Sequence, residues 1–140
     1  MKHPSGEQPP SAELQKDLEK ACEKLIYISE TDSPVEPFLD SVVGEITKDS
    51  VAKALGRKPA EAVEEIELRT FFEKLTRDRD WHNGAQQRLT KRFAELEKLL
   101  TENLDDCKVF RFGTIRIDIF VVGRDGEGNL AGVRTVAVET

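Results

Sequence analysis

The chain has 140 residues, which is the usual length of one domain with a single hydrophobic core. Apolar residues make up 38% of it and charged residues 34%, a composition typical of a soluble, well-solvated domain. The formal net charge of −6 argues against direct binding to nucleic acid, which needs a basic face, and it suits a basic protein partner.

The sequence predicts a cytoplasmic protein without membrane attachment. The first residues, MKHPSGEQPPSAE, contain no apolar segment of the kind that directs secretion. The longest purely apolar run, Ile119 to Val122, is far shorter than a membrane span. In the cytoplasm we expect Cys22 and Cys107 to be reduced, buried thiols, and a disulfide between them is the alternative.

The chain begins with a segment rich in Pro, Gly and Ser. Residues 1–11 are therefore predicted to be a disordered tail, and residues 12–140 a single domain. Ser11 is in position to cap a helix that runs to about Ile26. Its expected buried face consists of Leu14, Leu18, Ala21 and Leu25.

The next segment contains turn and strand signals. Thr31–Pro34 predicts a turn, and residues 35–39 predict a strand that Pro37 would place at the edge of a sheet. Thr47 is expected to begin a short helix that ends at Gly56.

The middle of the chain combines one strand with two helices. We expect a strand from Val63 to Leu68, followed by a helix opened by a capping box of Thr70 and Glu73. A polar loop over residues 76–84 leads to the longest predicted helix, from Ala85 to Asn103.

Three strands are predicted after that helix, over residues 108–112, 115–122 and 130–138. The last of them is apolar on both faces: Leu130, Val136 and Val138 alternate with Ala131, Val133 and Ala137. A strand of this kind is covered on both sides. We therefore predict an α+β fold, a three-layer α/β/α sandwich around a mostly antiparallel sheet.

No arrangement of residues predicts an enzyme. His3 and His82 are far apart in the sequence, and no cluster of His and Cys indicates a metal site. The glycines of residues 123–129 precede no helix, so they predict a hairpin loop and not a phosphate-binding loop. Asp118 is expected on the solvated side of its strand. A catalytic role for Glu30 or Asp118 lacks a matched partner residue.

Three polar features are left. Glu30 lies just beyond a predicted helix, Asp80 and Trp81 lie in the polar loop, and Glu139 and Thr140 end the chain. Each has an ordinary explanation: a solvated turn residue, a tryptophan that covers the edge of the core, and a chain end. An exposed tryptophan is, however, a favoured interface anchor. A chain end usually frays, whereas the apolar last strand would hold this one in a fixed place.

At these places the chain resembles the nuclease A inhibitor family (NuiA-like), whose members inhibit sugar-nonspecific nucleases. The resemblance is carried by LIYISETDSPVEPFL at residues 25–39, by RDRDW at 77–81, and by the closing run from 109 to 140 with its VAVET ending. It covers nearly the whole chain from residue 13 and is weakest over residues 40–62.

The resemblance implies a fold similar to that of the pathogenesis-related proteins. It also implies a non-enzymatic protein, without a cofactor of its own, that blocks the active site of a Mg²⁺-dependent ββα-metal nuclease, one inhibitor to one nuclease. Glu30 would stand in for the scissile phosphate, and Thr140, next to Glu139, would bring its hydroxyl to the Mg²⁺ of the nuclease. Asp80 and Trp81 would make a second contact.

Elementary chemistry agrees with this reading. Mg²⁺ prefers oxygen ligands, and the Mg²⁺ of a nuclease keeps open positions for substrate and water. A carboxylate imitates a phosphate oxygen in charge, yet it has no phosphodiester bond to be cut. The alternative is an interaction module on the same scaffold with a partner that is not a nuclease, because a fold does not by itself determine its partner.

Overall fold

The computed structural model describes residues 10–41, 44–56, 63–77 and 83–139. The helices in this part of the chain are α1 (Ser11–Cys22), α2 (Lys48–Ala54), α3 (Leu68–Thr76) and α4 (Gly84–Asn103). The strands are β1 (Ile26–Ile28), β2 (Asp32–Pro34), β3 (Glu36–Asp40), β4 (Val63–Glu67), β5 (Asp105–Phe112), β6 (Arg116–Arg124) and β7 (Leu130–Val138). None of the described helices is long and apolar enough to cross a membrane.

Five of the strands form one antiparallel sheet in the order β3-β7-β6-β5-β4, and β1 and β2 form a separate hairpin. The α+β fold and the strands of the second half are therefore as predicted. The expected edge position of the strand containing Pro37 is confirmed, because β3 pairs only with β7 in this sheet.

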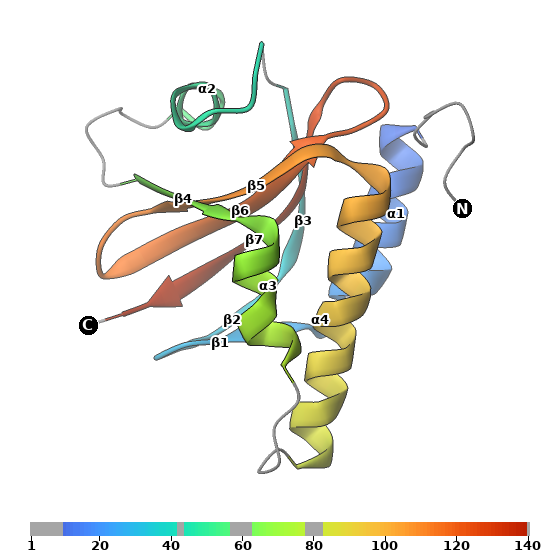
Figure 1. The fold of residues 1–140 in the computed structure, drawn as a ribbon, viewed down its shortest axis with the longest axis vertical. Helices are drawn as coiled ribbons and strands as arrows, with labels where there is room; N and C mark the ends of the chain where they lie inside the picture. Colours follow the sequence, from blue (N-terminus) through green and yellow to red (C-terminus); the bar gives the residue numbers. More distant parts are fainter. Residues whose placement is uncertain (1–9, 42–43, 57–62, 78–82, 140) are drawn as a thin grey trace.

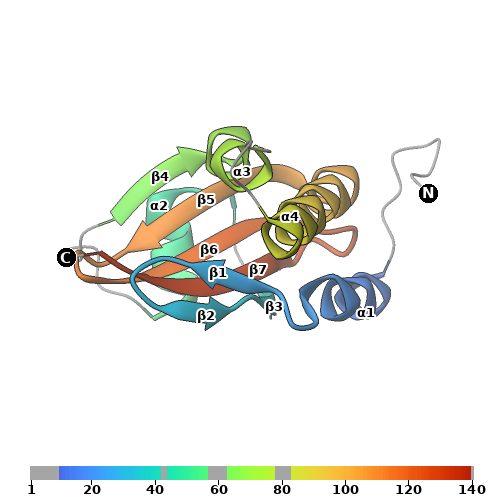
Figure 2. The same cartoon turned by 90° about the horizontal axis from the view of Figure 1, so that it is seen from below.

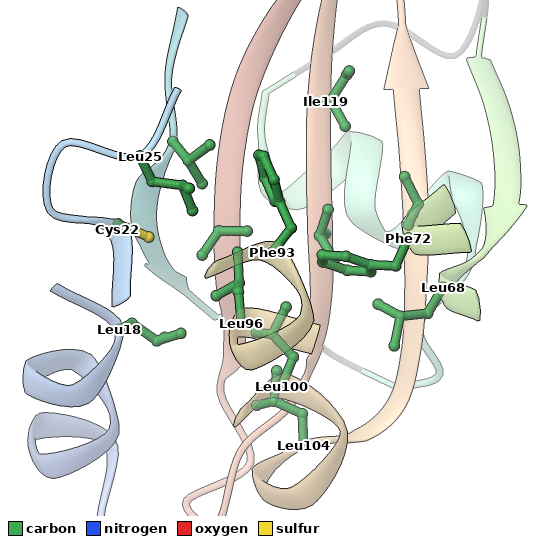
Figure 3. Packing of buried hydrophobic residues seen from close by; sticks show 14 of the residues in the cluster. Leu18, Cys22, Leu25, Leu68, Phe72, Phe93, Leu96, Leu100, Leu104 and Ile119 are labelled. Atoms are coloured by element: carbon green, nitrogen blue, oxygen red, sulfur yellow. The ribbon is translucent and has the colours of Figure 1, made fainter. Parts of the chain in front are cut away.

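Hydrophobic residues are buried on both faces of the sheet. On one face, α1, α3 and α4 cover the larger cluster, to which β7 contributes Ala131, Val133 and Ala137 (Figures 1 and 2). Figure 3 shows how Leu18 of α1, Phe72 of α3 and Leu96 of α4 converge on this face. On the other face, the short helix α2 packs over a smaller cluster that includes Leu130.

The last strand is thus buried on both faces at its start and more open toward its end. Leu130 is fully buried, whereas Val136 and Val138 on the same face are only half-buried and line an open groove of about 580 Å³. The covering of this second face by α2 is therefore partial. The similarity to the pathogenesis-related-protein fold stays a prediction.

Helix starts show where local sequence signals succeed and fail. Thr47 caps α2 as expected, in a capping box with Ser50. The predicted capping box of Thr70 and Glu73 is wrong, because α3 begins at Leu68, directly after the last paired residue of β4. Leu68 is buried at the first position of this helix, and no side chain caps its start.

The first helix is shorter than predicted. It ends at Cys22, because Lys24 adopts a left-handed conformation with φ +57° that no helix can continue. The next residues pair as the β1–β2 hairpin, so that most of the expected turn at Thr31–Pro34 is strand β2. The turn itself lies at residues 29–31.

Ser11 was expected to cap this helix, but it is the first helical residue and is buried. Its hydroxyl donates a hydrogen bond to the carboxylate of Asp125, and its backbone N–H donates to Glu127. Both acceptors belong to the loop between β6 and β7, the predicted hairpin loop. Their negative charges also lie at the positive end of the helix dipole. The loop between β6 and β7 therefore caps the start of this helix, although it is distant in the sequence.

Replacing Asp125 with alanine should destabilise the protein by about 2–3 kcal/mol, because this buried carboxylate accepts hydrogen bonds from Ser11, Glu127 and Asn129. Urea unfolding followed by circular dichroism measures the change. Asp17→Ala, which removes an exposed carboxylate from α1, is the control. Equal unfolding midpoints for the two variants would contradict the anchoring role.

Both cysteines are free, as expected. Burial raises the pKa of Cys22 to about 12. Burial, together with the negative charges of Asp105 and Asp106, raises the pKa of Cys107 to about 12 as well. The thiolate is the reactive form of cysteine. At pH 8 we therefore expect both thiols of the folded protein to react far more slowly with a disulfide reagent than those of the urea-unfolded protein. Rapid labelling of the folded protein would contradict this.

The same shift makes stability depend on pH. An unfolded thiol loses its proton near pH 9.0, whereas the folded thiols keep theirs up to about pH 12. Unfolding therefore releases protons between these values, and the contribution of the thiols to stability falls as the pH rises through this range. The midpoint of urea unfolding should be lower at pH 10.5 than at pH 8. This drop should be smaller in a variant in which both cysteines are replaced by alanine.

Candidate functional site

The end of the last strand is held between two turns. The backbone N–H of Val138 donates to the hydroxyl of Ser29 at 3.0 Å, and the N–H of Glu30 donates to the carbonyl of Val138 at 3.3 Å. On the other side, the N–H of Glu139 donates to the carbonyl of Ile115 at 2.9 Å. We call residues 28–32, 113–115 and 138–139 together the terminal edge. Both overall views place the turns of the β1–β2 and β5–β6 hairpins near the end of β7 (Figures 1 and 2).

Ser29 organises the turn that carries Glu30. Its hydroxyl donates to the carbonyl of Thr31 at 3.1 Å and accepts from the N–H of Thr31 at 3.3 Å, in addition to the bond from Val138. One donor and two acceptor positions are all that a hydroxyl has, so this side chain is fully used. Glu30 is therefore exposed at the tip of a turn whose backbone is fixed on both sides.

Ser29 was not among the predicted site residues. The signal that could have found it is a serine two residues before another turn residue, which is typical of a turn closed by a side-chain hydroxyl. Its bond to Val138 spans 109 residues, and no local pattern predicts that contact.

A second anchor holds the side chain of Glu139. The guanidinium of Arg111 donates to its carboxylate at 2.7 Å and lies 3.5 Å from the carboxylate of Glu64. The side chain of Arg111 is only 18% exposed, so water screens this pair less than a surface ion pair. Arg111 and Glu64, on β5 and β4, were also absent from the predicted site.

The side chains around this anchor form two small hollows. One, of about 360 Å³, lies among Tyr27, Phe71, Arg111 and Glu139. Burial raises the pKa of the Tyr27 hydroxyl, while the positive charge of Arg111 lowers it and the negative charge of Glu139 raises it. The other, of about 280 Å³, lies beside Gly113. In the first hollow, Tyr27 stacks on Phe71 with a distance of 5.9 Å between ring centroids.

The open groove on the opposite face of the sheet also reaches the terminal edge. Thr31 and Val138 form its end, and Arg116, Asp118 and Arg134 line it. Asp118 lies on the same face as Arg116, away from the three large helices, as expected.

The structure brings together two of the predicted contact residues, Glu30 and Glu139, through the backbone of Val138. The other three, Asp80, Trp81 and Thr140, lie outside the described residues. Within the described part of the chain, no group of three or more His, Cys, Asp or Glu side chains could hold a metal ion. The chemistry that this edge offers is an exposed carboxylate on a firmly held backbone.

Comparison with known proteins adds independent information. The family model described as nuclease A inhibitor-like protein (NuiA) matches residues 12–140, nearly the whole chain. No curated protein matches the sequence. The match includes residues 40–62, where the resemblance seen in the sequence is weakest. The chain therefore belongs to the nuclease A inhibitor-like protein family.

Proposed function

We propose that this protein inhibits a sugar-nonspecific, Mg²⁺-dependent ββα-metal nuclease by occupying its active site. The family indicates a nuclease inhibitor and a protein that is not itself an enzyme. The observation that carries the finer proposal is the hydrogen-bonded link between the turn of Glu30 and the end of β7. This link holds the turn of Glu30 beside Val138, two residues before Thr140 in the sequence, and so supports entry of both expected contacts into one cleft.

In this mechanism the carboxylate of Glu30 replaces an oxygen of the scissile phosphate. The hydroxyl of Thr140 replaces a water molecule on the Mg²⁺ of the nuclease, which prefers oxygen ligands. Asp80 and Trp81 make a second contact with the nuclease. No group of the inhibitor carries a bond that the nuclease can cleave, so occupancy of the cleft is inhibition.

The anchors at the terminal edge favour tight binding because they reduce the cost of ordering. Ser29 fixes the turn before the partner arrives, and Arg111 does the same for the side chain of Glu139. A segment that is already ordered loses less conformational entropy on binding. The net charge of −6 further favours encounter with a nuclease, whose cleft must be basic to bind nucleic acid.

Titration of DNA cleavage in Mg²⁺ by a purified ββα-metal nuclease tests the function. We expect cleavage to stop near one equivalent of the protein. Thr140→Val, which removes the hydroxyl and keeps the shape of the side chain, should weaken inhibition by about tenfold or more, and Thr140→Ser should retain it. Equal inhibition by the Val and Ser variants would exclude the metal contact. Absence of inhibition by the wild type would leave an interaction module with another partner.

A further inference from the structure

The terminal edge carries two unusually exposed apolar side chains. In the described part of the chain, the exposed large hydrophobic residues are Ile28 at 59%, Ile115 at 61% and Leu39 at 45%. Ile28 directly precedes the turn of Glu30, and Ile115 accepts the backbone hydrogen bond from Glu139. Ile28 and Ile115 therefore belong to the two turns that hold the end of β7, and the turn after Ile28 carries the proposed inhibitory carboxylate of Glu30.

Both isoleucines are held on fixed backbone. Ile28 pairs with Asp32 in the β1–β2 hairpin. The turn of Ile115 depends on Gly113, which has φ +114° and where an added Cβ would lie 2.3 Å from the carbonyl oxygen of Arg116. An exposed isoleucine on ordered backbone can be buried by a partner with little further loss of entropy, which is the property of an interface anchor.

The charges of the terminal edge indicate which partner covers it. Its charged residues are Glu30, Asp32 and Glu139, all acidic. A second copy of this chain docked through the same edge would bring these carboxylates together, which is unfavourable even with Arg111 beside Glu139. A basic partner is attracted to the same charges.

We infer that Ile28 and Ile115 are the apolar contacts that flank Glu30 in the complex, and that the nuclease has apolar surface on both sides of its basic, metal-containing cleft. This inference rests on the proposed function. It adds a requirement to the phosphate mimicry of Glu30: the nuclease must also bury two isoleucines beside the cleft that Glu30 enters. Nucleases with a basic cleft but polar walls on either side should be inhibited less well.

Threonine substitutions test the inference, because threonine keeps the β-branched shape and exchanges the ethyl branch of isoleucine for a hydroxyl. Ile28→Thr and Ile115→Thr should each raise the inhibition constant about fivefold, and together about 20- to 30-fold. Leu39→Thr is the matched control. Leu39 pairs with Ala131, seven residues before Val138 on β7, which is about 23 Å along an extended strand. The Leu39→Thr variant should inhibit the nuclease as well as the wild type does.

The outcomes separate the two proposals. If the wild type inhibits and the double variant, folded by circular dichroism, inhibits equally well, the isoleucine contacts are wrong and the proposed function stands. If the wild type inhibits no metal nuclease, both are wrong. Sedimentation of the wild type alone provides a further check: a dimer that Ile28→Thr dissociates would assign this edge to a second copy and overturn the inference.

Discussion

Glu30→Gln is expected to weaken inhibition of the nuclease by about 100-fold, which corresponds to about 3 kcal/mol of binding free energy. Glutamine has nearly the same shape as glutamate, and it removes the negative charge that stands in for the phosphate. We expect the turn to survive the change, because the hydroxyl of Ser29 and the backbone of Val138 hold it through hydrogen bonds that the substitution does not remove. The inhibition constant from steady-state DNA cleavage measures the effect.

A second glutamate serves as the control for the loss of one negative charge. Glu102 is exposed in the last turn of α4, close to the start of β5, whereas the terminal edge lies at the opposite end of that strand. Glu102→Gln should change the inhibition constant by less than about twofold, because only long-range attraction is altered. If both variants lose the same small amount, general charge attraction explains binding and the role of Glu30 as a phosphate mimic is wrong.

Gly132→Ala is expected to destabilise the fold by about 3 kcal/mol or more, a large part of the roughly 5–15 kcal/mol that stabilises a typical domain. Gly132 lies in β7, paired with Phe38 on one side and Val122 on the other, and has φ +155°. An added Cβ would lie 1.9 Å from the carbonyl oxygen of Val121. That oxygen belongs to the backbone of the neighbouring strand, so the strands must separate to accept a methyl group.

Gly128→Ala distinguishes this clash from conformational strain alone. Gly128 also has a positive φ, +81°, but an added Cβ there meets nothing within 4 Å. Its replacement should cost only the strain of the left-handed conformation, about 1–2 kcal/mol. Urea unfolding of both variants gives the comparison. A loss at Gly132 no larger than the loss at Gly128 would show that β7 can move away from β6, contrary to the expected rigidity.

Much of the architecture could be read from local patterns. Alternating apolar residues predicted the strands of the second half, and helical spacing predicted α4 from Ala85 to Asn103, one residue from its observed start. The position of β3 at the edge followed from Pro37, which cannot donate a ladder hydrogen bond. These features depend on periodicity or on one residue's covalent structure, and both are visible without knowing what lies opposite in the fold.

The errors share a cause, which is that tertiary contacts decided the outcome. A distant loop satisfies the start of α1, through the bond from Ser11 to Asp125 across 114 residues. The same helix stops at Cys22, because the left-handed conformation of Lys24 leads the chain into β1, which pairs with β2. Local propensity for a helix or a turn is worth a few tenths of a kcal/mol to about 1 kcal/mol per residue, and strand pairing and burial exceed it.

For the candidate site, the sequence by itself determined the residue types and the family resemblance, which family membership confirms over residues 12–140. The resemblance included Glu30 and the terminal residues. Only the tertiary structure decided that the turn of Glu30 lies beside the end of β7 and that Ser29 and Arg111 anchor this edge. It also decided that Ile28 and Ile115 are exposed there. The physical reason is that strand pairing brings together two hairpin turns and the end of β7, which are far apart in the sequence. Sequence periodicity predicts the type of each segment, but it does not predict which segments meet.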